Sequence, residues 1–203
     1  LMSAREFRER LREAMKDETP YGHRMLRQWR EMMGDLQNRL PVLQQLKEDR
    51  NFKGQLGEQL AEVRDSMIGE VTASQQVEGQ NRIDRITRLS GNTRFTKVRF
   101  EEGALRVDAA YEPAGTLVAS EVKNGTLDSI LTKVRDGSLD AQVRAGLQVA
   151  DVSQVEINQD TLMEMLRSSE KAQAFVEQVQ TAGGRVVVDL PSYNKQLQIF
   201  MNA

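Results

Sequence analysis

Three short runs rich in β-branched and aromatic residues follow one another in the middle of the chain, at residues 94–100, 105–111 and 116–123. The first two are separated by Glu-Glu-Gly at 101–103, and the last two by Glu-Pro-Ala-Gly at 112–115. Both connections contain residues that favour tight turns. Runs of this length with short turns between them are typical of antiparallel hairpins, so the sequence predicts a three-strand meander.

Charged residues occupy selected positions on the second and third of these predicted strands. Asp108 lies on the second, and Glu121 and Lys123 lie two positions apart on the third, so these two share one face of the sheet. Burying two carboxylates and an ammonium costs free energy unless the charges are paired or bind a metal ion. Mg²⁺ prefers oxygen ligands and often takes one or two carboxylates. The pattern therefore predicts a Mg²⁺ or Mn²⁺ site at Asp108 and Glu121, with Lys123 orienting or deprotonating a bound water.

The order of these residues, an Asp at 108 and then Glu-x-Lys at 121–123, resembles the motif of the PD-(D/E)xK nuclease superfamily. Val107 stands where the motif name has proline. The resemblance implies that Asp108, Glu121 and Lys123 are catalytic and that the two acids bind the metal. The alternative is a solvated strand face with a cross-strand ion pair.

A long helix is predicted from about Phe52 to Glu70, and it contains two glycines, Gly54 and Gly57. Glycine inside a helix costs roughly 1 kcal/mol relative to alanine, which a close approach of the helix to the sheet would explain. Gly57 and Glu58 resemble the Gly-Glu pair on the first helix of many superfamily members. That likeness implies that Glu58 is a third catalytic acid; the alternative is a solvent-facing glutamate.

The remaining elements fit around this centre. Residues 71–93 read as a loop with a short basic helix near 82–89. The later elements are predicted as helices at 126–135, 139–149 and 162–180, and strands at 152–157 and 185–190. This order resembles a restriction-endonuclease-like αβββαβ core, which implies an α/β (α+β) fold with a mixed sheet. We expect a nuclease domain at 51–203 and a helical N-terminal appendage at 1–50, with helices at 3–17 and about 23–38.

Composition excludes several classes of site. The chain has no cysteine and one histidine, which excludes zinc sites built from His and Cys and argues against a Ser-His-Asp triad. It contains no run of eighteen apolar residues that would predict a membrane span. The net charge of −2 argues against a protein that binds nucleic acid over its whole surface. Any binding of nucleic acid must therefore occur at a local basic patch. Cations between residues 82 and 99 form the local patch; the predicted contacts are Arg82, Arg85, Arg94 and Lys97.

The superfamily resemblance also suggests a biological role. The compact layout, the Gly57-Glu58 helix and the closing helix-strand pair are similar to those of nuclease toxin domains of bacterial polymorphic toxins and secretion-system effectors. This likeness implies a DNase that is delivered into a target cell and is blocked by an immunity protein. Arg135 and Gln142, on the helices after the meander, would then touch the phosphate backbone. RNA is the other substrate class left open. Two alternative functions stay open, a non-catalytic domain that binds a partner through its helical N-terminus and an endonuclease of DNA repair or restriction.

Overall fold

The computed structural model describes residues 3–16, 21–34 and 36–203. A seven-stranded mixed sheet lies at its centre, with the strand order β1-β2-β5-β6-β7-β3-β4. The strands are β1 (Gly69–Glu78), β2 (Asn81–Leu89), β3 (Thr93–Glu101), β4 (Ala104–Glu112), β5 (Leu117–Val122), β6 (Val152–Asn158) and β7 (Arg185–Leu190). The helices of the described residues are α1 (Ala4–Met15), α2 (Tyr21–Met32), α3 (Leu36–Glu48), α4 (Arg50–Ile68), α5 (Leu127–Arg135), α6 (Ser138–Val149), α7 (Gln159–Arg167), α8 (Ser169–Thr181) and α9 (Tyr193–Met201). None of them is long and apolar enough to cross a membrane.

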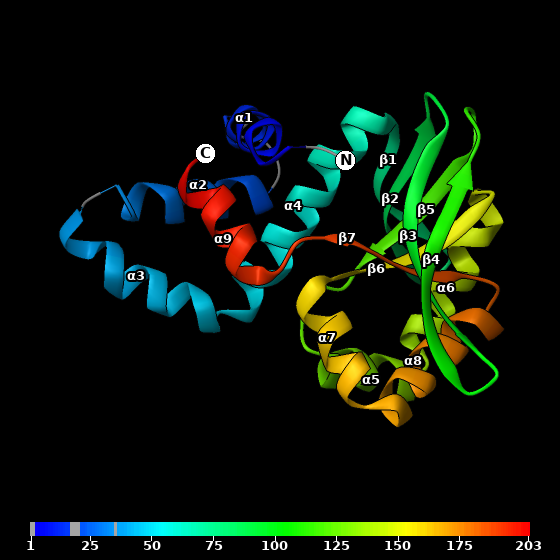
Figure 1. The fold of residues 1–203 in the computed structure, drawn as a ribbon. Coiled ribbons are helices and arrows are strands. Elements are labelled where there is room, and N and C mark those ends of the chain that lie inside the picture. Colours follow the sequence, from blue (N-terminus) through cyan, green and yellow to red (C-terminus); the bar gives the residue numbers. More distant parts are fainter. Residues whose placement is uncertain (1–2, 17–20, 35) are drawn as a thin grey trace.

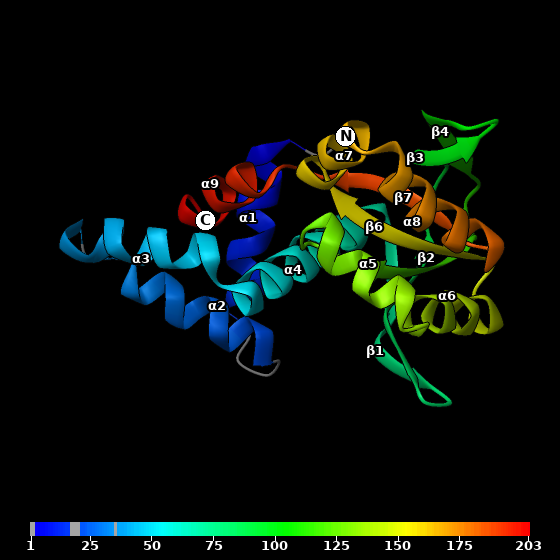
Figure 2. The same cartoon turned by 90° about the horizontal axis from the view of Figure 1, so that it is seen from below.

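Helices cover both faces of the sheet, because its central strands present apolar residues to each face. On β7, Val186 and Val188 pack with the buried residues of α5, α6 and α8, whereas Val187 packs on the opposite face near Ile68 of α4. The parallel strands β5, β6 and β7 form the middle of the sheet, where burial on both faces is expected. Figure 2 shows α5, α6 and α8 gathered on one side of these strands.

A helical lobe, made of α1, α2, α3, α9 and the first half of α4, lies beside the sheet (Figure 1). Its members share one apolar core, in which the ring of Phe52 stands edge-on to those of Trp29 and Phe200 at centroid distances of 6.0 and 5.2 Å. The predicted N-terminal helices therefore pack against helix α9. Neither α9 nor this packing was predicted from the sequence. Ser3 caps α1 in a capping box with Glu6, as the sequence pattern indicates.

The expected α/β class and mixed sheet are confirmed, but the three-strand meander is wrong. Its first two runs form the β3–β4 hairpin, whereas the third run, β5, pairs with β2 and β6 instead of β4. The predicted loop and basic helix at 71–93 are instead the antiparallel pair β1–β2 followed by a bend. The predicted helix at 162–180 is divided into α7 and α8 at Ser168.

Candidate functional site

Asp108 does not belong to the site that the sequence predicted for it. It lies on the edge strand β4, and β6, β7 and β3 separate that strand from β5, which contains Glu121 and ends just before Lys123. Its Oδ2 accepts a hydrogen bond from Nε of Arg99 at 2.7 Å, and this bond is the main reason why the pKa of Asp108 lies below its usual range. The prediction that Asp108 binds metal beside Glu121 is therefore wrong, and the cross-strand ion pair describes Asp108 instead.

Another aspartate, Asp84 on β2, lies next to Glu121. Strands β2 and β5 pair from Arg88↔Leu117 to Arg85↔Ser120, and Asp84 and Glu121 are the next residue on each strand. Beyond that point side chains replace the ladder: the backbone amide of Asp84 donates to Glu121 Oε1 at 3.2 Å, and that of Val122 donates to Asp84 Oδ2 at 3.0 Å. Both carboxylates are buried.

Glu58 approaches the same point from α4. Its pKa is raised to about 7, first by burial and then by the charge of Asp84 and a hydrogen bond to it. The pKa of Glu121 is raised to about 9, first by burial and then by the charge of Asp84, while Lys123 opposes the shift. Like charges that converge away from water favour the protonated form. Glu58, Asp84, Glu121 and Lys123 therefore form one cluster, which we call the carboxylate site.

The carboxylate site has donors suited to a divalent cation. Glu121 Oε2 is buried and accepts no hydrogen bond from the described residues, so one carboxylate oxygen lacks a partner. Carboxylate oxygens without sulfur or imidazole suit Mg²⁺ or Mn²⁺. Within the described ranges, however, no group of three or more Asp, Glu, His or Cys side chains is arranged to hold a metal ion as it stands. A cation held by Glu58, Asp84 and Glu121 would therefore have to draw these side chains together.

The predicted nucleic-acid contacts are scattered over the structure. Arg85 is buried and donates from Nε to Asp65 Oδ2 at 2.8 Å, so the prediction that it binds a phosphate is wrong. Arg82 is exposed on β2, close enough to lower the pKa of Glu58. Arg94 and Lys97 lie on β3 near the opposite edge of the sheet, so the basic stretch is not one continuous surface. Two further predicted contacts lie on separate helices, exposed Arg135 at the end of α5 and half-buried Gln142 on α6.

Asp84 was not among the site residues predicted from the sequence, because it stands in a basic stretch at residues 82–99. The available signal was an aspartate between two isoleucines, Ile83 and Ile86, upstream of Glu-x-Lys at 121–123. To use that signal, one would have to recognise β2 as a strand and pair it with β5, although the two strands are distant in sequence. Only the final fold brings these two strands together.

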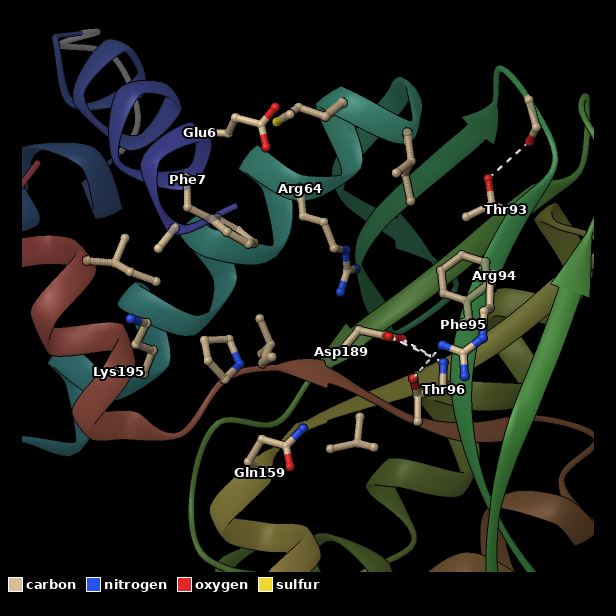
Figure 3. A pocket seen from close by; sticks show the side chains of 18 of the residues that line it. Glu6, Phe7, Arg64, Thr93, Arg94, Phe95, Thr96, Gln159, Asp189 and Lys195 are labelled. Atoms are coloured by element: carbon tan, nitrogen blue, oxygen red, sulfur yellow. Dashed lines mark hydrogen bonds between the residues drawn. The ribbon is translucent and has the colours of Figure 1, made fainter. Parts of the chain in front are cut away.

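A cavity of about 940 Å³ lies between α1, α4, α9 and strands β3 and β7. Figure 3 shows Arg64, Asp189 and Lys195 around it, together with Phe7 and Gln159. Both oxygens of Asp189 lie 3.3 Å from the amide of Thr96, and burial raises the pKa of that carboxyl. The carboxylate site does not line this cavity.

No protein-family model, curated protein or solved structure matches this chain. Function is therefore inferred from the residues of the carboxylate site and from their geometry.

Proposed function

We propose that this chain is a metal-dependent nuclease whose reaction centre is the carboxylate site, with Asp84 in the role that the sequence pattern had suggested for Asp108. One observation carries the proposal: four charged side chains meet at one point, and one oxygen of Glu121 has no hydrogen-bond partner among the described residues. Asp84 and Lys123 both shift the pKa of Glu121, and Asp84 also raises that of Glu58. Two buried acids, Asp84 and Glu121, beside a half-buried third, Glu58, are costly to a fold unless a cation or a reaction uses them.

The residues of the site divide the chemistry between them. Asp84 and Glu121 would hold Mg²⁺ or Mn²⁺, with Glu58 as a third oxygen donor; the cation would polarise a phosphoryl oxygen and acidify a bound water. Lys123 supplies a positive charge next to Glu121, where it stabilises the negative charge that develops as a phosphodiester is attacked. Glu58, with a pKa near 7, can gain or lose a proton at neutral pH.

DNA is the proposed substrate, and RNA is the alternative that the same chemistry allows. Exposed Arg82 on β2 is a predicted phosphate contact that lies close enough to the carboxylate site to lower the pKa of Glu58. The toxin or effector role, delivery by a bacterial secretion system to the target-cell cytoplasm and inhibition by an immunity protein depend on the family resemblance, and they stay predictions.

The direct test is cleavage of plasmid DNA, and separately of RNA, by the purified chain with Mg²⁺, with Mn²⁺ and with EDTA. We expect cleavage only with metal, and a loss of about 100-fold or more in Asp84→Asn and Lys123→Met because both act at the reacting phosphate. Asp108→Asn is the matched control and should keep wild-type activity. Absence of cleavage of either nucleic acid by the wild type contradicts the function, and loss in Asp108→Asn but not in Asp84→Asn contradicts the site.

A second candidate is a non-catalytic interaction domain that uses its helical lobe. It is favoured by the observation that no three acidic side chains of the described residues are arranged to hold a metal as they stand. Calorimetric titration with Mn²⁺ separates the two candidates. Binding that is lost in Asp84→Asn supports the nuclease, and no binding supports the interaction domain.

A further inference from the structure

The residue after Lys123 is held far more tightly than Lys123 itself. Among the described residues no hydrogen bond or ion pair holds the Lys123 ammonium, so its place depends on the backbone that carries it. That backbone is fixed on one side by the Lys123 amide, which donates to the carbonyl oxygen of Glu156 at 2.9 Å. On the other side it is fixed by Asn124, a residue that is 5% exposed.

Asn124 and Gln196 of α9 form a reciprocal pair of amides. Asn124 Nδ2 donates to Gln196 Oε1 at 2.7 Å, and Gln196 Nε2 donates to Asn124 Oδ1 at 2.8 Å. The remaining bonds tie the pair to α4 and to the start of α9: Asn124 Nδ2 also donates to the carbonyl of Lys53 at 2.8 Å, and Gln196 Nε2 to that of Pro191 at 2.9 Å. Gln196 is fully buried, so these bonds have no water to replace them.

A third amide completes the network. Asn158, at the end of β6, donates from Nδ2 to Asn124 Oδ1 at 2.8 Å and to its carbonyl oxygen at 3.3 Å. Buried amides whose donors and acceptors are all engaged adopt one arrangement and resist rotation. Asn124 is therefore anchored to α4, α9 and β6 at once.

The helical lobe in turn holds α9 in place. Arg30 of α2 donates to the carbonyl oxygens of Met201 and Ala203, and the hydroxyl of Tyr193 donates to the carbonyl of Leu46 at 2.6 Å. Phe200 packs edge-on to Phe52 of α4. A continuous set of contacts thus leads from the lobe through Gln196 to the backbone beside Lys123.

We propose that Gln196 is a positioning residue of the carboxylate site: through Asn124 it fixes the backbone that carries Lys123, and so makes cleavage depend on the C-terminal helix. The inference rests on the proposed nuclease function, since it assigns a role in that reaction. It predicts that Gln196 affects turnover and not metal binding, because none of its contacts reaches Glu58, Asp84 or Glu121.

The test compares Gln196→Met, which keeps the side-chain length but removes the amide, with Gln198→Met on the exposed face of the same helix. The first readout needs no activity: hydrogen exchange of the backbone amide of Lys123, which donates to the carbonyl of Glu156. We expect exchange there to rise about tenfold or more in Gln196→Met while the amides of residues 117–120 stay unchanged. Gln198→Met should match the wild type throughout.

The second readout is kinetic. In Gln196→Met the kcat for plasmid cleavage should fall about 10- to 100-fold, because misplacing a reacting group by about 1 Å has that effect. The KM and the Mn²⁺ dissociation constant should change less than threefold. In a Lys123→Met background, Gln196→Met should cause no further loss, whereas a merely structural role would add its own effect.

Each outcome bears on one proposal. Unchanged exchange at Lys123 overturns the positioning role, and so does raised exchange with unchanged kcat. If the wild type cleaves neither DNA nor RNA, the nuclease proposal fails, whereas exchange still decides whether Gln196 fixes this backbone. If Gln196→Met does not fold, Gln196→Glu replaces it, because the glutamate keeps an acceptor for Asn124 Nδ2. Exchange at Lys123 should then rise above that of the wild type by a smaller factor. If exchange in Gln196→Glu equals that of the wild type, the positioning role is overturned.

Discussion

A Cβ atom on Gly57 would lie 2.6 Å from the Cβ of Asn124, closer than such atoms approach in folded proteins. The absence of a side chain at this position lets α4 contact the end of β5. The next residue on the helix, Glu58, is thereby brought to Asp84. The close approach that the sequence suggested for this helix is therefore confirmed at Gly57. It is wrong for Gly54, where an added Cβ would meet nothing within 4 Å.

These two glycines give a matched pair of variants on one helix. Gly57→Ala should lower the free energy of unfolding by about 1–3 kcal/mol, because Asn124 is locked by its hydrogen bonds and cannot move aside. Gly54→Ala should raise it by up to about 1 kcal/mol, since alanine is the better helix former and the space is open. Urea unfolding measures both. A stabilised Gly57→Ala would show that α4 and β5 do not touch as described.

Metal binding should strengthen as pH rises. Without metal, Glu58 and Glu121 hold protons up to about pH 7 and pH 9, and a cation must displace those protons to reach the carboxylates. The apparent Mn²⁺ affinity should therefore rise between about pH 6 and pH 8, by up to about tenfold per pH unit for each proton released. Calorimetry in buffers of different ionisation enthalpy counts the protons. Glu58→Gln should release fewer, and a pH-independent affinity would contradict the protonated site.

The same raised pKa makes Glu121 a burden on the metal-free fold at high pH. A carboxyl whose pKa rises from its ordinary 4.5 to about 9 on folding binds its proton more tightly in the folded state, so its contribution to stability is lost as pH rises between those values. Glu121→Gln keeps the carbonyl that accepts from Asp84. At about pH 8 with EDTA it should be more stable than the wild type by at least about 1 kcal/mol, and near pH 4.5 the two should be similar.

The control for this comparison is Glu70→Gln, an exposed carboxylate on β1, which should change stability little at either pH. Thermal unfolding at the two pH values measures all three proteins. A Glu121→Gln variant that is less stable at about pH 8 would show that the carboxylate is solvated or paired, contrary to the geometry of the site.

The sequence was sufficient where local pattern decides structure. Alternation and turn residues identified β5, which contains Glu121, and the β3–β4 hairpin. The helix that reaches the site was indicated by the likeness of Gly57-Glu58 to the superfamily pair. The sequence was insufficient for β2, in which Ile83, Ile86 and Leu89 recur every three residues. That spacing resembles one face of a helix. It arises because charged residues of β2 occupy buried positions of the sheet, where specific partners hold them and a strand would ordinarily have apolar residues.

The turn at 112–115 shows a second limit. Its Pro and Gly predict a tight hairpin, yet the amide of Gly115 donates to Leu89 O at 2.7 Å, and that of Leu89 donates to Thr116 O at 2.9 Å. The chain thus leaves the β3–β4 hairpin and joins β2 instead of folding back on β4. Turn chemistry fixes where the chain bends, whereas the choice of partner strand depends on burial of the whole strand. This choice is why Asp84 replaces Asp108.

A buried network of ion pairs connects α4 to the sheet. Arg64 binds both oxygens of Glu156, one of them at 2.8 Å, and also binds Asp65, which in turn accepts from Arg85. Glu156 is fully buried. Glu156→Gln leaves Arg64 without its main counter-charge, so the free energy of unfolding should fall by about 3 kcal/mol or more.

The matched comparison is Glu9→Gln, which breaks the exposed pair of Glu9 with Arg5 on α1 and should cost less than about 0.5 kcal/mol. The double variant Arg64→Met/Glu156→Gln separates pairing from packing. Because it removes the uncompensated charge along with its partner, it should be less destabilised than the sum of the single variants in urea unfolding. Additive losses would mean that Arg64 and Glu156 do not interact as the structure describes, and that α4 is held over the sheet by its apolar contacts alone.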